Sequence, residues 1–154
     1  MSFDLINNLP EGYCDYAFSE LIPSPQLFLN TIFGVYMDID PFASPLSSTV
    51  NYQVLGSAPC RTMVISVPDI SYYGCPSQSM TSQMVLYETT NVVEVYVHER
   101  PSGCSWNDGN AVIGIQNGAG TLGYTPPGRN TGDWSANSEA WRFTPNGPSN
   151  VTFE

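Results

Sequence analysis

Two aspartates separated by one residue are the clearest candidates for metal binding in this sequence. In Asp38-Ile39-Asp40-Pro41, alternate residues of an extended chain share a face, so both carboxylates point to one side. Carboxylate oxygens are the ligands that Ca²⁺ prefers, and Asp15 or Asp69 could complete such a site. The alternative is that Asp38 and Asp40 cap turns around Pro41 by accepting backbone hydrogen bonds. The pattern therefore predicts either a calcium site or a pair of turn caps.

The residues that could catalyse a reaction are few and poorly grouped. His98 is the only histidine, so a Ser/His/Asp triad would need it as the base, and no G-x-S-x-G nucleophile motif is present. Glu88, Glu94 and Glu99 suggest glycoside hydrolysis, which needs two carboxylates facing each other across a groove. Nothing in their spacing fixes that separation. We therefore expect no enzymatic activity and treat a glycan-acting enzyme as the least favoured class.

Three aromatic residues are candidates for contact with a ligand. Trp106 and Trp134 lie in segments rich in Gly, Asn and Asp, and Tyr96 shares a strand face with Glu94. Aromatic rings combine apolar area with a polar atom, which suits stacking against sugars. The alternative for the two tryptophans is that they anchor their loops on the fold. Trp141 alternates with Phe143 and is expected in the core.

Strands must position these side chains, because hydrophobic residues alternate with period two along much of the chain. The predicted strands cover 50–54, 61–67, 83–88, 91–99, 111–116, 121–124 and 140–144. A compact turn over 88–91 joins two of them, and helix is limited to one short turn at 16–21 or 26–33. The sequence predicts an all-β, antiparallel, jelly-roll-like β-sandwich in one domain over 1–145, followed by a linker or tail over 146–154.

The four cysteines predict two disulfide bonds and an oxidising compartment. If strands 61–67, 83–88 and 92–99 form an up-down-up meander, Cys75 and Cys104 both lie at its upper end. Bridged cysteines need Cα atoms within about 7 Å, so Cys75–Cys104 satisfies the geometry. Cys14–Cys60 is then left by elimination. Buried free thiols are the alternative for all four residues.

The charge balance excludes several classes of partner. The chain of 154 residues has 14 acidic residues and four arginines but no lysine, so its net charge is -10. Nucleic-acid binding needs cationic side chains to displace counterions, and docking on anionic lipid needs them as well. No apolar run is long enough to cross a membrane, so direct membrane insertion is not expected. The first ten residues lack a basic and an apolar signal-peptide region.

Two long segments of the sequence resemble a known family. The first joins QMVLYETTNVVEVYV to the stretch from Cys104 to Asn117, and the second runs from Pro127 to Pro145. These segments resemble an extracellular domain of Bacteroidetes surface proteins that are associated with gliding motility and exported by type IX secretion. The order of elements is also similar to the nidogen-like domain. The resemblance implies that the first strands are missing, which would leave an open sheet edge and an exposed apolar core surface.

Composition and resemblance together predict a non-catalytic extracellular or cell-surface module, belonging to a longer exported protein, that serves adhesion or structural assembly. The alternative is a carbohydrate-binding module. The expected partners are a surface glycan, another protein or neighbouring copies of the chain. No cofactor is expected beyond possible calcium at Asp38 and Asp40.

Overall fold

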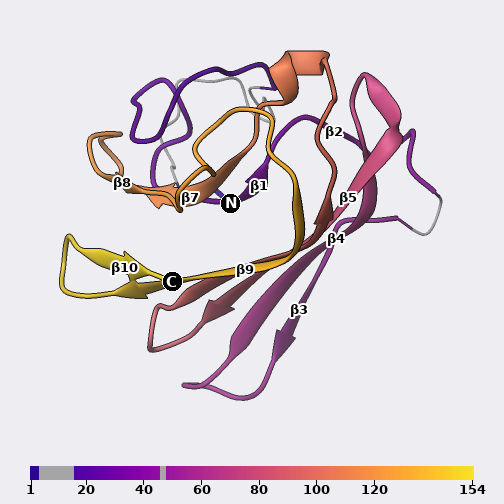
Figure 1. Cartoon of the computed structure of the whole chain (residues 1–154). Helices are drawn as coiled ribbons and strands as arrows, with labels where there is room; N and C mark the ends of the chain where they lie inside the picture. Colours follow the sequence, from indigo (N-terminus) through magenta and orange to yellow (C-terminus); the bar gives the residue numbers. More distant parts are fainter. Residues whose placement is uncertain (4–15, 46–47) are drawn as a thin grey trace.

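The computed structural model describes residues 1–3, 16–45 and 48–154, which form two facing antiparallel sheets (Figure 1). The larger sheet has the strand order β10-β9-β6-β5-β4-β2, with β3 also paired to β4. The smaller sheet has the order β1-β7-β8. The prediction of an all-β antiparallel sandwich is confirmed.

The large sheet is built around a meander of three long strands, β4 (Thr62–Tyr72), β5 (Cys75–Tyr87) and β6 (Val93–Arg100). Ile65 pairs with Met84 and Met84 with Val95, so these apolar side chains share the face that meets the small sheet. The turn predicted over 88–91 is present, and the Tyr87 amide donates to the Val92 carbonyl across it at 3.0 Å. The period-two pattern thus identified both the strands and their buried face.

The remaining strands of the large sheet extend the meander at both edges. At one edge lie β2 (Ile39–Asp40) and β3 (Asn51–Leu55), and at the other lie β9 (Ala136–Pro145) and β10 (Val151–Phe153). Strand β10 pairs with β9 through Phe153 and Phe143. The segment 146–154, expected as a linker or tail, therefore contributes a strand to the sheet.

The small sheet consists of β1 (Thr31–Tyr36), β7 (Val112–Gln116) and β8 (Gly123–Tyr124). The helical turn expected over 26–33 is wrong, because residues from Thr31 onward pair with β7 instead. The turn expected over 16–21 is also wrong, since those residues form no regular element. The irregular segment 16–30 lies on the outer side of this sheet, where Phe18, Ile22 and Leu27 pack against Phe33 and Val112.

The backbone of the segment 16–30 is held to the small sheet by hydrogen bonds with the side chain of Gln116. The Gln116 side-chain amide accepts from the Ser24 amide at 2.9 Å and donates to the Phe28 carbonyl at 2.7 Å. Buried polar groups need such partners, because an unpaired one costs free energy. This third layer therefore leaves only the inner face of β1 and β7 for the large sheet.

Of the two predicted disulfide bonds, one is confirmed and the other involves a residue outside the described part of the chain. Cys75 and Cys104 are bonded, with Cα atoms 5.9 Å apart. Cys60 is exposed and has no disulfide partner among the described residues, in the turn between β3 and β4. Cys14 lies outside the described residues, so the predicted Cys14–Cys60 bridge stays a prediction.

The helical content of the described residues is one short 3₁₀ turn, η1 (Trp106–Gly109). No helix in this part of the chain is long and apolar enough to cross a membrane.

Candidate functional site: an apolar groove beside β1

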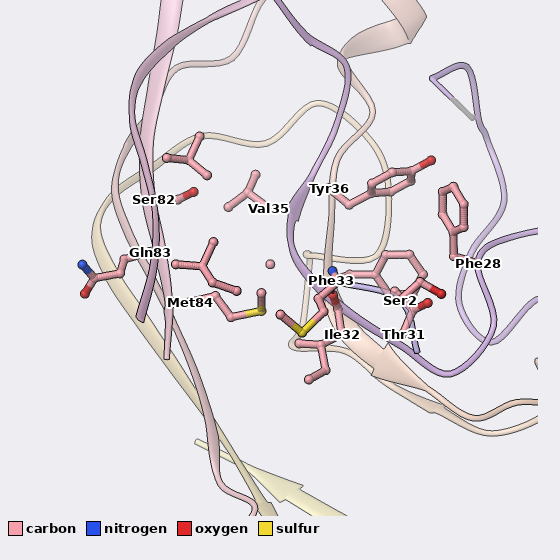
Figure 2. A pocket seen from close by; sticks show the side chains of 14 residues that line it. Ser2, Phe28, Thr31, Ile32, Phe33, Val35, Tyr36, Ser82, Gln83 and Met84 are labelled. Carbon is pink, nitrogen blue, oxygen red and sulfur yellow. Dashed lines mark hydrogen bonds between the residues drawn. The ribbon is translucent and has the colours of Figure 1, made fainter. Parts of the chain in front are cut away.

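An apolar groove lies between the edge of the small sheet and the inner face of the large sheet (Figure 2). Its volume is about 390 Å³, and its walls come from β1 on one side and from β4 and β5 on the other. Ile65, Val67 and Met84 line the large-sheet wall, while Ile32 and Val35 line the β1 wall. Pockets of this size and composition bind apolar groups, so the groove is the main candidate site.

A glycine in β1 helps to keep the groove open. A Cβ atom added at Gly34 would lie 3.9 Å from the Cβ and Sδ atoms of Met84, which is ordinary contact distance. The pairing of β1 with β7 also shifts register between Phe33 and Tyr36, as at a β-bulge. The bulge bends β1 locally, and the missing side chain of Gly34 leaves space beside Met84.

One edge of β1 carries a very short strand partner. Ser2 pairs with Thr31 in an isolated antiparallel bridge, and the Ile32 amide donates to the Met1 carbonyl at 2.9 Å. The Met1 amino group donates in return to the Ile32 carbonyl at 2.7 Å. Among the described residues, no strand continues this pairing beside Phe33, Gly34 and Val35. Backbone N–H and C=O groups on such an edge can form hydrogen bonds with another strand.

The apolar surface continues from the groove onto β3. Tyr52 pairs with Ile65 and Val54 pairs with Met63, so the side chains of Tyr52 and Val54 share the inner face of the large sheet. Tyr52 is 71% exposed and Val54 is 51% exposed. The small sheet does not reach this end of the large sheet (Figure 1). Among the described residues, the β1 wall of the groove and the exposed apolar side chains of β3 therefore both meet the apolar face of β4.

The described lining of the groove is mainly apolar. Within residues 1–3, 16–45 and 48–154 it contains no Asp, Glu, His, Lys or Arg side chain, and the Met1 amino group beside it donates a hydrogen bond to the Ile32 carbonyl. Its polar lining side chains include Ser2, Thr31 and Ser82. In Figure 2 the side chain of Gln83 points away from the cavity. This surface can desolvate apolar side chains and pair with backbone groups.

The two aspartates proposed for calcium are both engaged in hydrogen bonds. Asp40 accepts from the amides of Phe42 and Ala43 at 2.9 and 3.2 Å, which is the turn-capping alternative. Asp38 accepts from the Trp106 ring nitrogen at 2.8 Å, and burial raises its pKa. No group of three or more His, Cys, Asp or Glu side chains that could hold a metal occurs within residues 1–3, 16–45 and 48–154. Calcium binding stays a prediction, and Asp15 lies outside the described residues.

Trp134 is not exposed, which corrects its prediction as a ligand contact. It is only 8% exposed, and its ring nitrogen donates to the Ala111 carbonyl at 2.9 Å. The guanidinium groups of Arg100 and Arg129 lie 4.3 and 4.6 Å from the ring centre. Trp134 lies in a loop rich in Gly and Asn, but these cation–π contacts hold its ring in the core. The loop-anchor alternative is the one that the structure supports.

Trp106 is a half-exposed member of an aromatic pair. It is 39% exposed, and its ring lies 5.0 Å from that of Tyr73, which is 47% exposed. The hydrogen bond to Asp38 fixes the orientation of the indole. Gly74 lies beneath it, since an added Cβ there would be 2.9 Å from the Trp106 Cβ. Trp106 therefore remains available for a ligand, next to the Cys75–Cys104 bridge.

Tyr96 belongs to a polar cluster on the outer face of the large sheet, away from the groove. Glu94 accepts from the hydroxyl groups of Tyr87 and Tyr96, both at 2.7 Å, and forms an ion pair with Arg142 at 2.6 Å. Burial would raise the pKa of Glu94, but these hydrogen bonds hold it below its usual value. The same contact raises the pKa of Tyr96 to about 12. Tyr96 is 40% exposed, so its ring can still touch a ligand.

The remaining charged candidates do not assemble into a catalytic group. His98 is exposed on β6, as expected, and Glu99 is exposed beside it. Glu88 pairs with Arg61, whose hydrogen bonds lower the pKa of Glu88 to about 2. In the part of the chain that the structure describes, the groove receives none of these carboxylates.

Sequence reasoning missed the groove itself. The alternation of Met63, Ile65 and Val67 identifies the apolar face of β4, but β1 was not recognised as a strand. The available signal was the short run Thr31-Ile32-Phe33-Gly34-Val35, which is rich in β-branched and aromatic residues, as expected of a strand with both faces covered. A cavity between two sheets depends on both walls, so one wall alone could not reveal it.

Comparison with known families gives one match. The family model described as "NIDO related" matches residues 12–153, which is most of the chain. Neither the curated proteins nor the solved structures give a match. The match covers both sheets and every residue of the groove except Met1 and Ser2.

Proposed function

The chain belongs to the NIDO-related family, and on that basis we propose that it is a non-catalytic, extracellular module that binds a protein partner through the groove beside β1. The family and the Cys75–Cys104 disulfide both fit an extracellular domain. Adhesion or structural assembly at a cell surface, of the kind used by type IX-secreted proteins of Bacteroidetes, is the role proposed for it.

The observation that carries this proposal is the apolar surface left uncovered by the small sheet. The groove of about 390 Å³ is continuous in the large sheet with the exposed side chains of Tyr52 and Val54. Contiguous exposed apolar surface on a folded domain marks an interaction site more often than scattered apolar residues do. A protein partner would bury this surface against its own apolar side chains.

A protein suits the groove better than a glycan. Sugar rings need several hydrogen-bonding groups around a flat aromatic face, whereas the described groove lining consists mainly of aliphatic, methionine and aromatic side chains taken together. Its aromatic residues, Phe28, Phe33 and Tyr36, lie at the β1 wall. A charged or strongly hydroxylated ligand would lose hydration here without replacing it.

The proposal is tested by retention of the purified chain on the surface of the cells that produce it. The chain is labelled, and its binding is compared on untreated cells, protease-treated cells and periodate-treated cells. We expect protease to abolish retention and periodate, which oxidises glycans, to leave it unchanged. No retention on untreated cells would overturn the proposal.

Two variants of β4 assign the retention to the groove. Val67→Glu places a carboxylate in the groove, while Ser66→Glu places one on the opposite face of the same strand. We expect Val67→Glu to reduce retention at least about tenfold and Ser66→Glu to leave it within about twofold. Equal effects of the two substitutions would contradict binding through the groove.

Glycan binding is the second candidate, favoured by the exposed pair of Trp106 and Tyr73. An indole fixed by its hydrogen bond to Asp38 presents a rigid face to a sugar ring. Under this alternative, a glycan array gives binding that Trp106→Ala abolishes and Val67→Glu leaves intact. Loss of cell retention after periodate would favour this candidate over the first.

A further inference from the structure

We propose that a polar pocket on the outer face of the large sheet binds the ammonium group of a lysine side chain from a protein partner. The pocket has a volume of about 370 Å³, and its described lining consists of residues 43–45, Asp69, Ser71 and residues 76–79. It lies where a bulge in β4 meets the turn after β2 and the start of β5. This inference goes beyond the proposed function, because it does not use the groove beside β1.

The strand pairing places this polar pocket on the face of the sheet that is turned away from the core. Ile70 pairs with Met80, and both side chains are buried. Successive side chains of a strand point to opposite faces, so the neighbouring pair, Ser71 and Ser79, points away from that core. Both serines line the pocket. The groove lies on the inner face of the same sheet, so the two surfaces can be tested separately.

Three hydroxyl groups of the polar pocket offer acceptors rather than donors. The Ser79 hydroxyl donates to the Asp69 carboxylate at 2.5 Å. The hydroxyl groups of Ser71 and Ser44 donate to backbone carbonyls at 3.3 and 2.8 Å. A hydroxyl has one proton and two lone pairs. Each of these three groups has therefore used its proton within the protein and can only accept from a ligand.

Two further side chains add acceptors to the polar pocket. Asp69 is exposed and is the one charged side chain in the described lining. The Gln78 side-chain amide donates to the Ser102 carbonyl at 3.0 Å, but its oxygen is buried and finds no donor among the described residues. A buried acceptor without a donor costs free energy, which a ligand donor would recover. The polar pocket therefore favours a ligand that is cationic and rich in donors.

An ammonium group suits these acceptors better than a guanidinium group or a metal ion. It combines a compact charge with three donors. A guanidinium group binds best to both oxygens of one carboxylate, but Ser79 already donates to one oxygen of Asp69. Calcium takes about six to eight oxygen ligands, several of them carboxylates as a rule, whereas the described lining holds one carboxylate.

The lysine comes from outside these 154 residues. They include no lysine, and each of the four arginines forms an ion pair with a carboxylate elsewhere in the chain. The net charge of -10 attracts a basic partner at long range. Phe42 directly precedes the lining residue Ala43 and is fully exposed. A protein that inserts a lysine can also bury this ring, whereas a small free amine cannot.

The test titrates the whole chain with N-acetyl-lysine methylamide and follows the backbone amide signals by NMR. We expect saturable shifts at Asp69, Ser71 and Ser79, with a dissociation constant of about 1–10 mM. The same probe acetylated on its side-chain nitrogen has lost its charge and should bind at least about tenfold more weakly. The arginine analogue should bind at least about threefold more weakly than the lysine probe. These comparisons use the unaltered protein.

Two aspartates in similar backbone conformations provide a matched pair of variants. Asp69 and Asp108 are both exposed, and their φ angles are 48° and 51°, a left-handed conformation that asparagine tolerates. Replacing either one by asparagine removes one negative charge. We expect Asp69→Asn to weaken lysine binding at least about fivefold and Asp108→Asn to leave it within about twofold. Equal effects would reduce the binding to net charge and overturn the site.

Other outcomes also decide the inference. Saturable shifts elsewhere, with none at Asp69, Ser71 and Ser79, would overturn it. Calcium that shifts these three amides more strongly than the lysine probe does would overturn it in favour of a metal site. If Val67→Glu reduces cell retention but the lysine probe does not bind, this inference fails and the proposed function stands. If the probe binds but retention does not depend on Val67, the reverse holds.

Discussion

At the scale of single residues, the two tryptophans that were candidates for ligand contact differ: Trp134 is structural, whereas Trp106 is available to a ligand. Trp134 lies between the guanidinium groups of Arg100 and Arg129, and Arg100 donates to the Gly109 carbonyl at 2.8 Å. The Nε and Nη1 atoms of Arg100 find no hydrogen-bond acceptor among the described residues, so the ring face of Trp134 is a principal contact of this buried charge. Trp106 has no comparable burial.

Replacing Trp134 should therefore cost much more stability than replacing Trp106. We expect Trp134→Ala to lower the free energy of unfolding by about 3–5 kcal/mol, because it removes a buried ring and the face that contacts Arg100. Trp106→Ala should cost less than about 1.5 kcal/mol, since the ring is half-exposed. Urea denaturation followed by circular dichroism measures both values. Similar losses of unfolding free energy in the two variants would contradict the assignment of Trp134 as structural and Trp106 as available to a ligand.

The Glu94 cluster predicts a dependence of stability on pH. Hydrogen bonds from two tyrosines and Arg142 lower the pKa of folded Glu94 below its usual 4.5. Its stabilising effect is therefore fully present above that value and is lost as the pH falls through the lower folded pKa. At pH 7 we expect Glu94→Gln to cost about 1–3 kcal/mol, with the lower end favoured because Arg142 is exposed.

The measurement is the free energy of unfolding of both proteins from pH 7 to pH 2.5. The difference between wild type and Glu94→Gln should shrink as the pH falls below 4.5. Glu99→Gln, on the same strand but exposed, is the control and should show a smaller difference at pH 7. If the difference in unfolding free energy between wild type and Glu94→Gln grew as the pH fell, the stabilising role of ionised Glu94 would be refuted.

At the scale of elements, the Cys75–Cys104 bridge ties the start of β5 to the loop after β6. It closes a loop with a sequence separation of 29 residues, which includes the 88–91 turn. Tyr72 and Met80 pack beside the bridge and form a small second core at this end of the sheet. Tyr72 also donates to the Pro101 carbonyl at 3.0 Å, which fixes the same loop.

Removing this bridge should destabilise the fold without removing the groove. For a loop of this length we expect Cys75→Ala with Cys104→Ala to cost about 3–4 kcal/mol, from the entropy regained by the unfolded chain. Cys60→Ala, which removes a free and exposed thiol, should change stability by less than about 0.5 kcal/mol. Chemical denaturation in the absence of reductant measures both. A large effect at Cys60 would contradict its assignment as unpaired.

At the scale of the whole molecule, the two sheets differ in size and do not cover each other. Seven strands face three, and the segment 16–30 covers the outer side of the small sheet rather than the exposed part of the large one. Within the described residues, the result is a side of the sandwich, bounded by β1 and β4, where the apolar face of the large sheet is uncovered. The net charge of -10 opposes self-association, because like-charged copies repel each other.

This open side predicts binding of a neutral apolar dye by the native protein. Nile red should bind to the folded chain with increased, blue-shifted emission, because the groove of about 390 Å³ excludes water around it. Val67→Glu should weaken the signal at least about fivefold, while Ser66→Glu should leave it nearly unchanged. An unchanged signal in Val67→Glu would place the dye elsewhere.

The fold class was predictable because its signals are local. Alternation in the segments 61–67 and 91–99 identified strands and their inward faces, since a period of two is a property of each strand alone. The Cys75–Cys104 pair followed from the same meander. The charge balance and the lack of lysine argue against nucleic acid and anionic lipid as partners without reference to any fold, and that prediction stays untested.

The tertiary structure decided which of those residues are available to a partner. Trp106 and Trp134 lie in similar loops, yet only packing against Arg100 and Arg129 makes Trp134 a core residue. The groove requires that β1 and β4, some 30 residues apart in sequence, stand beside each other without full contact. Such an arrangement depends on pairing between strands that are far apart in the sequence. The free energy of that pairing balances the area buried against the chain entropy lost, and no local sequence pattern determines this balance.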